Sequence, residues 1–222
     1  MSSAFKHLSI NLNRRFAMHK LTRADLMSLE TYAEKRAAYR AEVMAHKRHR
    51  RVPLGPNATL YFEDRVTMQY QIQEVLRIEK IFEADAIDEE LAAYNPLIPD
   101  GGNWKATFML EFEDEAERRR ALAGLIGVER AVWIQVGGRD KCRPVANEDL
   151  SRETEDKTSA VHFLRFELSP EAAAEAKAGA AIRIGVDHPN YTHAAYQLPA
   201  AVAESLAADL VADLAADPAA PA

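Results

Sequence analysis

The sequence has a single cysteine, Cys142, and this scarcity excludes several classes of protein at once. One cysteine cannot close an internal disulfide, and one thiolate cannot by itself hold an iron–sulfur cluster or a cysteine-ligated zinc ion. We therefore expect no self-ligated iron–sulfur cluster, and we expect a reducing, cytoplasmic location. Lys141 and Arg143 can lower the pKa of the thiol, but no histidine is close in sequence, so a packed thiol is favoured over a nucleophile.

Long hydrophobic runs and well-known catalytic signatures are also missing. No stretch of about 18 uncharged apolar residues occurs, which predicts no membrane span. Residues 1–20 show no cleavage pattern, so no signal peptide is expected, and Met18 is a candidate for the natural start. The chain lacks a Walker A loop, a G-x-G-x-x-G fingerprint, an H-E-x-x-H pair, a G-x-S-x-G elbow and, on its helix 65–83, the E-x-x-H pattern of di-iron proteins. Because none of these motifs is present, the sequence indicates no particular reaction. Whether the protein is an enzyme stays open.

Charge is plentiful but unevenly distributed. The 222 residues include 28 Lys and Arg and 34 Asp and Glu, a net charge of −6. Residues 1–53 hold 12 basic and 4 acidic residues, whereas the rest of the chain holds 16 and 30. Such an asymmetry is typical of chains that meet a partner of opposite charge. It predicts four parts: a flexible extension at 1–20, a basic helical segment at 21–53, an α+β core domain at 54–215 and a disordered tail at 216–222.

Hydrophobic spacing predicts an α+β protein. Helices are expected over 22–49, where Thr22 and Asp25 form a capping box, and over 65–83, with a strand at 57–63 between them. The second half predicts strands at 105–112, 131–137, 160–168 and 181–187, and helices at 114–125, after Ser169-Pro170 and at 199–215. Its β-α-β-β-α-β order is that of a ferredoxin-like split β-α-β antiparallel sheet. The predicted fold adds an N-terminal helical module and a C-terminal helix.

The densest polar cluster, residues 187–193, follows a predicted strand. Asp187, His188 and His193 offer the carboxylate and imidazole groups that transition metals bind, and His162 on a neighbouring strand is a further candidate ligand. A single transition metal ion is the expected cofactor if this site exists. The alternative is an ordinary turn, because Asp, Pro and Asn favour turns, with His162 as a buried core histidine.

Helix 65–83 carries a second polar group. Gln71, Glu74 and Arg77 recur at three-residue spacing, Glu79 follows, and Glu74 can pair with Arg77 along the helix. This group is either a binding site or a solvated face. The basic run 47–51 can attract phosphate backbones, but few aromatic residues interrupt it and the rest of the chain is acidic, so nucleic-acid binding is not favoured.

Five stretches of this sequence resemble a bacterial family known only as a domain of unknown function. They are Leu21-Thr-Arg-Ala-Asp-Leu26, Leu54-Gly-Pro56, Phe62-Glu63-Asp64-Arg65, Tyr70-Gln-Ile-Gln-Glu-Val-Leu-Arg-Ile-Glu79 and Asp187-His188-Pro-x-Tyr191. The resemblance covers residues 20 to 213. Members are often encoded beside a rubrerythrin-like protein and a cysteine-rich iron–sulfur protein, which implies a redox or peroxide-defence setting. The resemblance carries over no catalytic residue.

The family motifs overlap with the polar candidates, so the best binding candidates are Gln71, Glu74, Arg77, Glu79 and Tyr191. The predicted function is that of an accessory or binding protein of a redox or peroxide-defence system, which docks on an iron–sulfur or rubrerythrin-like partner. One alternative is a metal-dependent enzyme or sensor that uses residues 187–193. A second alternative is a nucleic-acid binder that uses the basic run 47–51.

Overall fold

The computed structural model describes residues 19–150, 152–154 and 156–211, which form two compact units. Within this range the helical unit comprises residues 19–49 and 63–100, and the sandwich unit comprises residues 50–62 and 101–211. The helical unit thus includes residues 63–100, which were predicted to belong to the core domain 54–215. The prediction differs because no change in composition marks where the chain leaves and re-enters each unit. Most of the predicted extension, with Met18, and the predicted tail lie outside the described residues.

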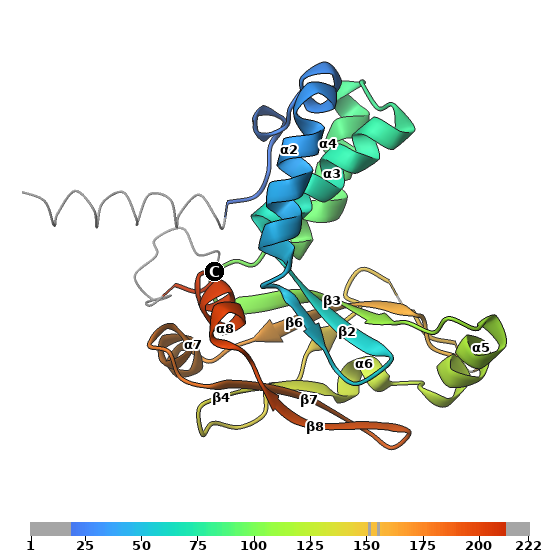
Figure 1. Ribbon diagram of the computed structural model, residues 1–222, viewed down its shortest axis with the longest axis vertical. Helices are drawn as coiled ribbons and strands as arrows, with labels where there is room; N and C mark the ends of the chain where they lie inside the picture. The colour runs from blue at the N-terminus through green and yellow to red at the C-terminus, as the bar shows by residue number, and fades with distance from the viewer. Residues whose placement is uncertain (1–18, 151, 155, 212–222) are drawn as a thin grey trace, which may run out of the picture. The chain divides into compact units, whose positions relative to one another are not determined.

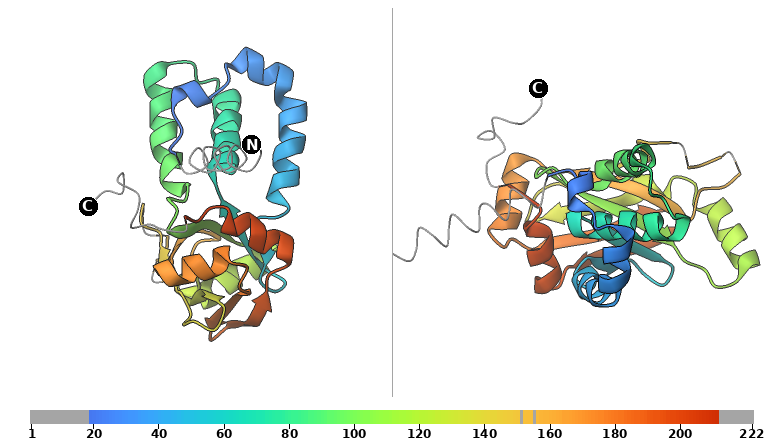
Figure 2. Two further views of the ribbon diagram at one scale, coloured as in Figure 1. Left: turned by 90° about the vertical axis from the view of Figure 1, so that its left-hand side faces the viewer. Right: turned by 90° about the horizontal axis from the view of Figure 1, so that it is seen from above.

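The helical unit is built from three helices and two short 3-10 turns (Figure 1). In chain order they are η1 (Arg23–Asp25), α2 (Leu29–Lys47), α3 (Arg65–Glu79), α4 (Ala84–Tyr94) and η2 (Asn95–Leu97). Figure 2 shows α3 between α2 and α4. A small hydrophobic core lies among them and consists of Leu21, Met68, Ile72, Leu76, Leu91 and Ile98.

Local capping explains where these helices begin and end. The Thr22 and Asp25 capping box forms, but it caps the start of the short turn η1. Ser28 begins α2 by accepting a hydrogen bond from the Thr31 N–H. The predicted helix 22–49 is therefore two elements. Helix α3 ends at Lys80, which has a left-handed backbone, so α3 is shorter than the predicted 65–83 and α4 follows as a separate helix.

The sandwich unit contains two sheets. A five-stranded sheet has the order β1-β2-β3-β6-β5, and a three-stranded sheet has the order β4-β7-β8. The strands are β1 (Arg51–Pro53), β2 (Ala58–Glu63), β3 (Asn103–Leu110), β4 (Val132–Val136), β5 (Val145–Ala146), β6 (Val161–Glu167), β7 (Ile182–His188) and β8 (Tyr191–Gln197). The helices are α5 (Glu115–Gly124), α6 (Val128–Ala131), α7 (Pro170–Lys177) and α8 (Ala200–Ala207).

The α+β class is confirmed, but the ferredoxin-like arrangement is not. Strands β3 and β6 pair in one sheet, with Trp104 opposite Phe166, while β4 and β7 pair in the other, with Ile134 opposite Ile184. The four strands of the β-α-β-β-α-β pattern are thus divided between two sheets. Alternating hydrophobicity predicts which face of a strand is buried, but it does not predict which strands become neighbours.

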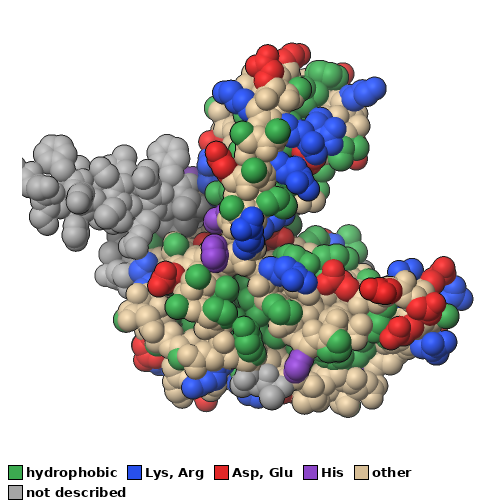
Figure 3. Space-filling model, viewed as in Figure 1, with side chains coloured by type: hydrophobic (Ala, Val, Ile, Leu, Met, Phe, Trp, Pro, Cys, Tyr) green, Lys and Arg blue, Asp and Glu red, His purple; other side chains and the backbone are tan. Residues whose placement is uncertain are grey.

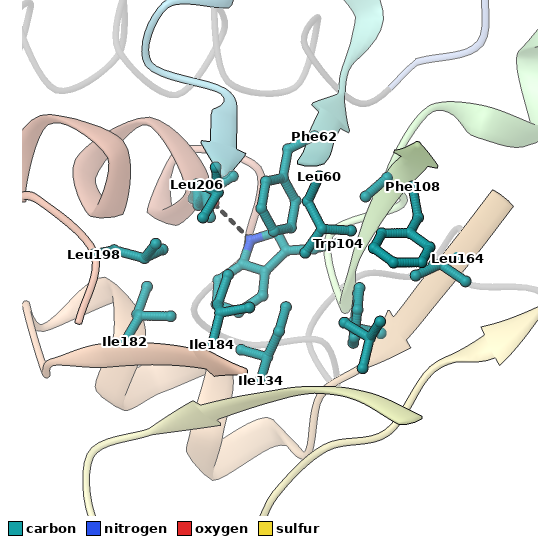
Figure 4. Close-up of a cluster of buried hydrophobic side chains, with 14 of the residues drawn as sticks. Leu60, Phe62, Trp104, Phe108, Ile134, Leu164, Ile182, Ile184, Leu198 and Leu206 are labelled. Atoms are coloured by element: carbon teal, nitrogen blue, oxygen red, sulfur yellow. Dashed lines mark hydrogen bonds between the residues drawn. The ribbon is translucent and has the colours of Figure 1, made fainter. Parts of the chain in front are cut away.

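One large hydrophobic core joins the two sheets (Figure 4). Trp104 lies at its centre among side chains from both sheets, and its indole N–H donates to the Leu206 carbonyl at 2.8 Å, which attaches α8. Buried Arg50 adds a second attachment, because it donates to the Ser205 carbonyl and pairs with Asp209. Helix α8 ends at Ala207, so it is shorter than the predicted helix 199–215, whose last four residues lie outside the described range.

Strand β8 carries an irregularity where it pairs with β7. Ile184 is opposite Tyr196 and Val186 is opposite His193, so two residues of β8 face the single Gly185 of β7. This arrangement is a β-bulge. A Cβ atom on Gly185 would lie 2.4 Å from the Trp133 indole, so only glycine fits there. Among the described helices, none combines the length and the hydrophobicity that a membrane span requires.

Candidate functional site

The sandwich unit contains an acidic groove of about 760 Å³. It is formed by the turn between β1 and β2, the end of β3 with the residues that follow it, the first turn of α5 and the residue before β6. Three glutamates and one arginine line it together with apolar side chains; the full lining is Pro56, Asn57, Leu110, Glu111, Phe112, Glu113, Glu117, Arg118 and Ala160. Acidic side chains are visible around α5 in Figure 3. The groove therefore suits a ligand that combines positive charge with apolar surface.

Tyr191 holds one wall of the groove. Its hydroxyl donates to the Leu54 carbonyl at 2.6 Å and accepts from the Asn57 N–H at 3.2 Å, and burial raises the pKa of this phenol. Gly55 between them has a φ of +78°, and a Cβ atom there would lie 2.3 Å from the His193 ring. The family motifs at 54–56 and 187–191 thus meet at one turn, where Tyr191 orients Asn57 toward the groove.

Hydrogen bonds to Glu111 hold the same turn from the other side. The Glu111 N–H donates to the Asn57 carbonyl at 2.7 Å, and the Asn57 side-chain amide donates to the Glu111 carbonyl at 3.0 Å. The Thr59 hydroxyl donates to the Glu111 carboxylate at 2.9 Å. Asp114 then caps α5 by accepting from the Glu117 N–H at 2.7 Å. The groove is therefore organised before any ligand enters.

The predicted metal-ligand segment forms the turn between β7 and β8. His188 is buried; its Nε2 lies 3.1 Å from the Ile126 carbonyl and its Nδ1 accepts from the Asn190 N–H at 3.2 Å, so backbone groups occupy both ring nitrogens. Asp187 pairs with Lys141 and Arg143, and Lys141 holds the pKa of its carboxyl below the usual range.

His193 does not complete a ligand set with these residues. Its side chain is exposed and packs edge-on to the Tyr191 ring. Within the part of the chain that the structure describes, no three His, Cys, Asp or Glu side chains are grouped as metal ligands would be. These contacts favour the turn alternative for residues 187–193, and a metal site there remains a prediction.

His162 is fully buried and has its own set of partners. Its Nδ1 lies 3.0 Å from the Asn147 amide nitrogen, and its Nε2 lies 3.0 Å from both the Thr158 hydroxyl and the Ser159 carbonyl. Burial lowers the pKa of the ring, and the nearby buried carboxylate of Glu129 opposes this effect in part. The ring therefore ties together the two ends of the loop before β6, as a core histidine does.

In the helical unit, Glu74 is the centre of a hydrogen-bond network. Its carboxylate accepts from the Tyr32 hydroxyl at 2.6 Å and from two nitrogens of Arg36 at 2.7 and 2.8 Å. The predicted pair with Arg77 also forms, at 3.2 Å. The hydrogen bond from Arg36 is the main reason why the pKa of Glu74 falls to about 2. This network joins α2 to α3, so its structural role is clear, while Gln71 and Glu79 on the same helix are exposed.

Three polar contacts in this unit were not predicted. The buried Gln73 side chain accepts from the Met27 N–H at 2.6 Å, and Gln69 donates to the Asp25 carbonyl, so the start of α3 is fastened to the segment at 25–27. His46 Nε2 lies 2.5 Å from the Asp64 carboxylate. Each partner is at least 18 residues away along the chain, and no local spacing signals such a contact.

The basic run 47–51 is divided by the fold. Lys47 lies over the Tyr70 ring, Arg50 is buried against Asp209, and Arg51 lies over the Tyr61 ring. Arg50 is therefore not available to a partner, whereas Arg48, His49 and Arg51 are exposed. Burial raises the pKa of the Cys142 thiol to about 11, which agrees with a packed thiol.

Comparison with known proteins places the chain among proteins without an assigned activity. A family model described as "Protein of unknown function (DUF3501)" matches residues 20–210. A crystal structure of a protein of unknown function from Burkholderia pseudomallei K96243 is 50% identical, with a TM-score of 0.83, and the match covers 87% of this chain and 100% of that one. No curated protein matches.

Proposed function

Because this chain belongs to the DUF3501 family, whose description assigns no activity, we propose its function from the geometry of the acidic groove. The protein is an accessory docking protein, and its groove binds a lysine- or arginine-rich segment of a partner protein. The observation that carries this proposal is the lining of the groove, in which three glutamates and one arginine surround apolar side chains.

The lining suits basic side chains for two physical reasons. The long aliphatic stems of Lys and Arg can cover Phe112 and Leu110, while their charged ends reach Glu113 and Glu117. The walls are already held by the hydrogen bonds of Asn57, so little conformational entropy is lost when the segment binds. Charge complementarity of this kind mainly accelerates association and selects the partner.

The family resemblance supports the choice of partner. It implies a gene neighbourhood with a rubrerythrin-like protein and a cysteine-rich iron–sulfur protein. We propose that one of these two proteins presents the basic segment. The protein would then serve a redox or peroxide-defence system without holding a cluster itself, which agrees with its single cysteine.

The experiment is a titration of the full chain with each of the two neighbouring proteins by isothermal calorimetry, at low and at physiological salt. The double variant Glu113→Gln/Glu117→Gln should weaken binding about tenfold, which corresponds to about 1.4 kcal/mol, and should reduce its salt dependence. Glu115→Gln is the matched control, because Glu115 lies on the same helix, is exposed and pairs with Arg119 outside the groove lining.

Three results would argue against the proposal. If neither protein binds at low salt, both proposed partners are excluded. The control removes one charge and the double variant removes two, so a loss of binding free energy in the control that is half that of the double variant would show that only the overall charge matters. Binding that is unchanged in the double variant would place the contact elsewhere on the molecule.

A further inference from the structure

The helical unit exposes apolar side chains at the C-terminal end of α3. Gln71, Val75 and Ile78 recur at four- and three-residue spacing, so they share one face of this helix. Ile78 is 64% exposed, and Phe82, just beyond the end of α3, is 63% exposed; no other large hydrophobic side chain in the described residues is as exposed. Val75 is partly buried. We call Val75, Ile78 and Phe82 the apolar stripe.

The core of the unit lies on a different face of α3. Met68, Ile72 and Leu76 recur at four-residue spacing and are buried in that core. Ile78 follows Leu76 by two residues, which turns its side chain to roughly the opposite side of the helix. Helix α3 is therefore apolar on two faces, and within the described part of the chain only the core face is covered. Single exposed apolar residues are common, but a second apolar face on one helix indicates a contact surface.

Negative charge borders the apolar stripe. Residues 79–90 include six acidic residues and one basic residue. Glu79, Glu89 and Glu90 pair with no basic side chain among the residues that the structure describes. Burial and the nearby carboxylates of Glu79 and Glu89 raise the pKa of Glu90, so α3 and α4 bring these three glutamates close together. Figure 3 shows hydrophobic and acidic side chains side by side at the upper end of the helical unit.

We propose that the apolar stripe binds a basic amphipathic helix of a partner protein. The apolar face of such a helix would cover Ile78 and Phe82, and its lysine or arginine side chains would meet Glu79 and Glu90. A second helix suits this row of side chains, because the ridges of one helix fit the grooves of another. From Gln71 to Glu79, α3 rises about 12 Å, which roughly two turns of a partner helix would cover. A second copy of the same surface fits less well, because two acidic borders repel each other.

This surface is separate from the acidic groove. It belongs to the helical unit, whereas the groove belongs to the sandwich unit, so the inference does not depend on the proposed function of the groove. It also divides the motif at 70–79 into two parts. Gln73 and Glu74 join the segments of the helical unit, while Ile78 and Glu79 remain exposed for a partner.

An NMR titration of the isotope-labelled full chain tests the proposal. The probe is a short synthetic peptide in which leucine and lysine are spaced to form an amphipathic helix, and its match has glutamate in place of lysine. The lysine peptide should shift the amide signals of residues 71–90, and the glutamate peptide should not. Ile78→Ser/Phe82→Ser should weaken this binding about tenfold. Val145→Ser/Leu150→Ser is the matched control, since it removes two exposed hydrophobic side chains of the sandwich unit, and it should leave the binding unchanged.

A second pair of variants tests the acidic border. Glu79→Gln/Glu89→Gln should weaken binding of the lysine peptide and reduce its salt dependence. Glu30→Gln/Glu34→Gln removes the same number of charges from exposed positions of α2 and should have little effect. Equal weakening by the two pairs overturns the assignment of the border, because only the overall charge would then matter.

The groove variant separates this surface from the proposed function. Glu113→Gln/Glu117→Gln should leave the response of residues 71–90 unchanged, so failure of the groove and failure of this surface are distinguishable. The proposal is overturned if the lysine peptide does not shift these residues, or if Ile78→Ser/Phe82→Ser binds it as tightly as the unchanged chain. Shifts of the same residues that grow with protein concentration alone also overturn it, because a second copy would then cover the stripe.

Discussion

The two units are stabilised by different means. The helical unit has a core of six buried hydrophobic residues, and polar contacts such as those of Glu74 and Gln73 join its segments. The sandwich unit has a much larger core that is shared by two sheets, with Trp104 at its centre. A small core contributes little to the free energy of unfolding. Hydrogen bonds to charged groups therefore contribute a larger share of the stability of the helical unit. The difference predicts that salt acts mainly on the helical unit and loss of packing mainly on the sandwich unit, and that pH acts on the two units in different ranges.

The largest expected effect is in the sandwich core. Trp104→Ala removes a fully buried side chain and its hydrogen bond to Leu206, so the free energy of unfolding should fall by about 3–5 kcal/mol. Urea unfolding followed by circular dichroism measures this change. Tyr196→Ala is the control, because Tyr196 is exposed and should cost far less. A small effect of Trp104→Ala would contradict the comparison between the units.

A smaller but clear effect is expected in the helical unit. Glu74→Gln removes the charge that Arg36 and Tyr32 bind, and should cost about 1–3 kcal/mol. Hydrogen exchange of α2 and α3 reports this loss for the helical unit alone. Glu79→Gln, on an exposed position of the same helix, should change little. If both variants behave alike, the network does not stabilise the unit.

The pH dependence of stability should also differ between the two units. The pKa of Glu74 is about 2 in the folded chain and 4.5 in an unfolded one, so its contribution is complete above 4.5 and is lost as pH falls toward 2. The pKa of buried His162 is below its unfolded value of 6.5, so the unfolded state takes up the proton first and the sandwich unit loses stability as pH falls below 6.5.

Unfolding of each unit between pH 7 and 2 measures these two windows. Glu74→Gln should flatten the pH dependence of the helical unit near pH 3–4, and His162→Gln should flatten that of the sandwich unit near pH 6. Each variant should leave the profile of the other unit unchanged. A single shared profile would show that the units unfold together.

The smallest effect concerns the groove. Tyr191→Phe removes the hydroxyl that binds Leu54 and Asn57, and should cost about 1 kcal/mol of stability. It should also weaken binding of the basic segment, because the groove wall loses its support. Tyr196→Phe on the same strand is the control. If Tyr191→Phe leaves binding unchanged, the Tyr191 hydroxyl is not needed to position the turn at 54–57 for binding.

Local signals in the sequence predicted local structure, whereas contacts between residues far apart in the chain could not be predicted. The alternation at 160–168 predicts β6 within a residue or two, and the Glu74–Arg77 pair follows from three-residue spacing. Tyr32 and Arg36, however, reach Glu74 from about 40 residues away, and nothing in their own surroundings indicates it. Strand β8 was missed because its first residues also form a polar turn pattern. The groove was missed because four separate segments contribute to it.

The bulge in β8 has a consequence for how the molecule behaves at high concentration. Strand β8 lies at the edge of its sheet, and its seven residues carry no charge and no proline. Such an edge is a template on which other chains can add a strand and begin to aggregate. The extra residue opposite Gly185 interrupts the regular spacing of backbone groups along that edge. At the edge of β8, the irregular backbone of the bulge, rather than charge, therefore disfavours the addition of another strand.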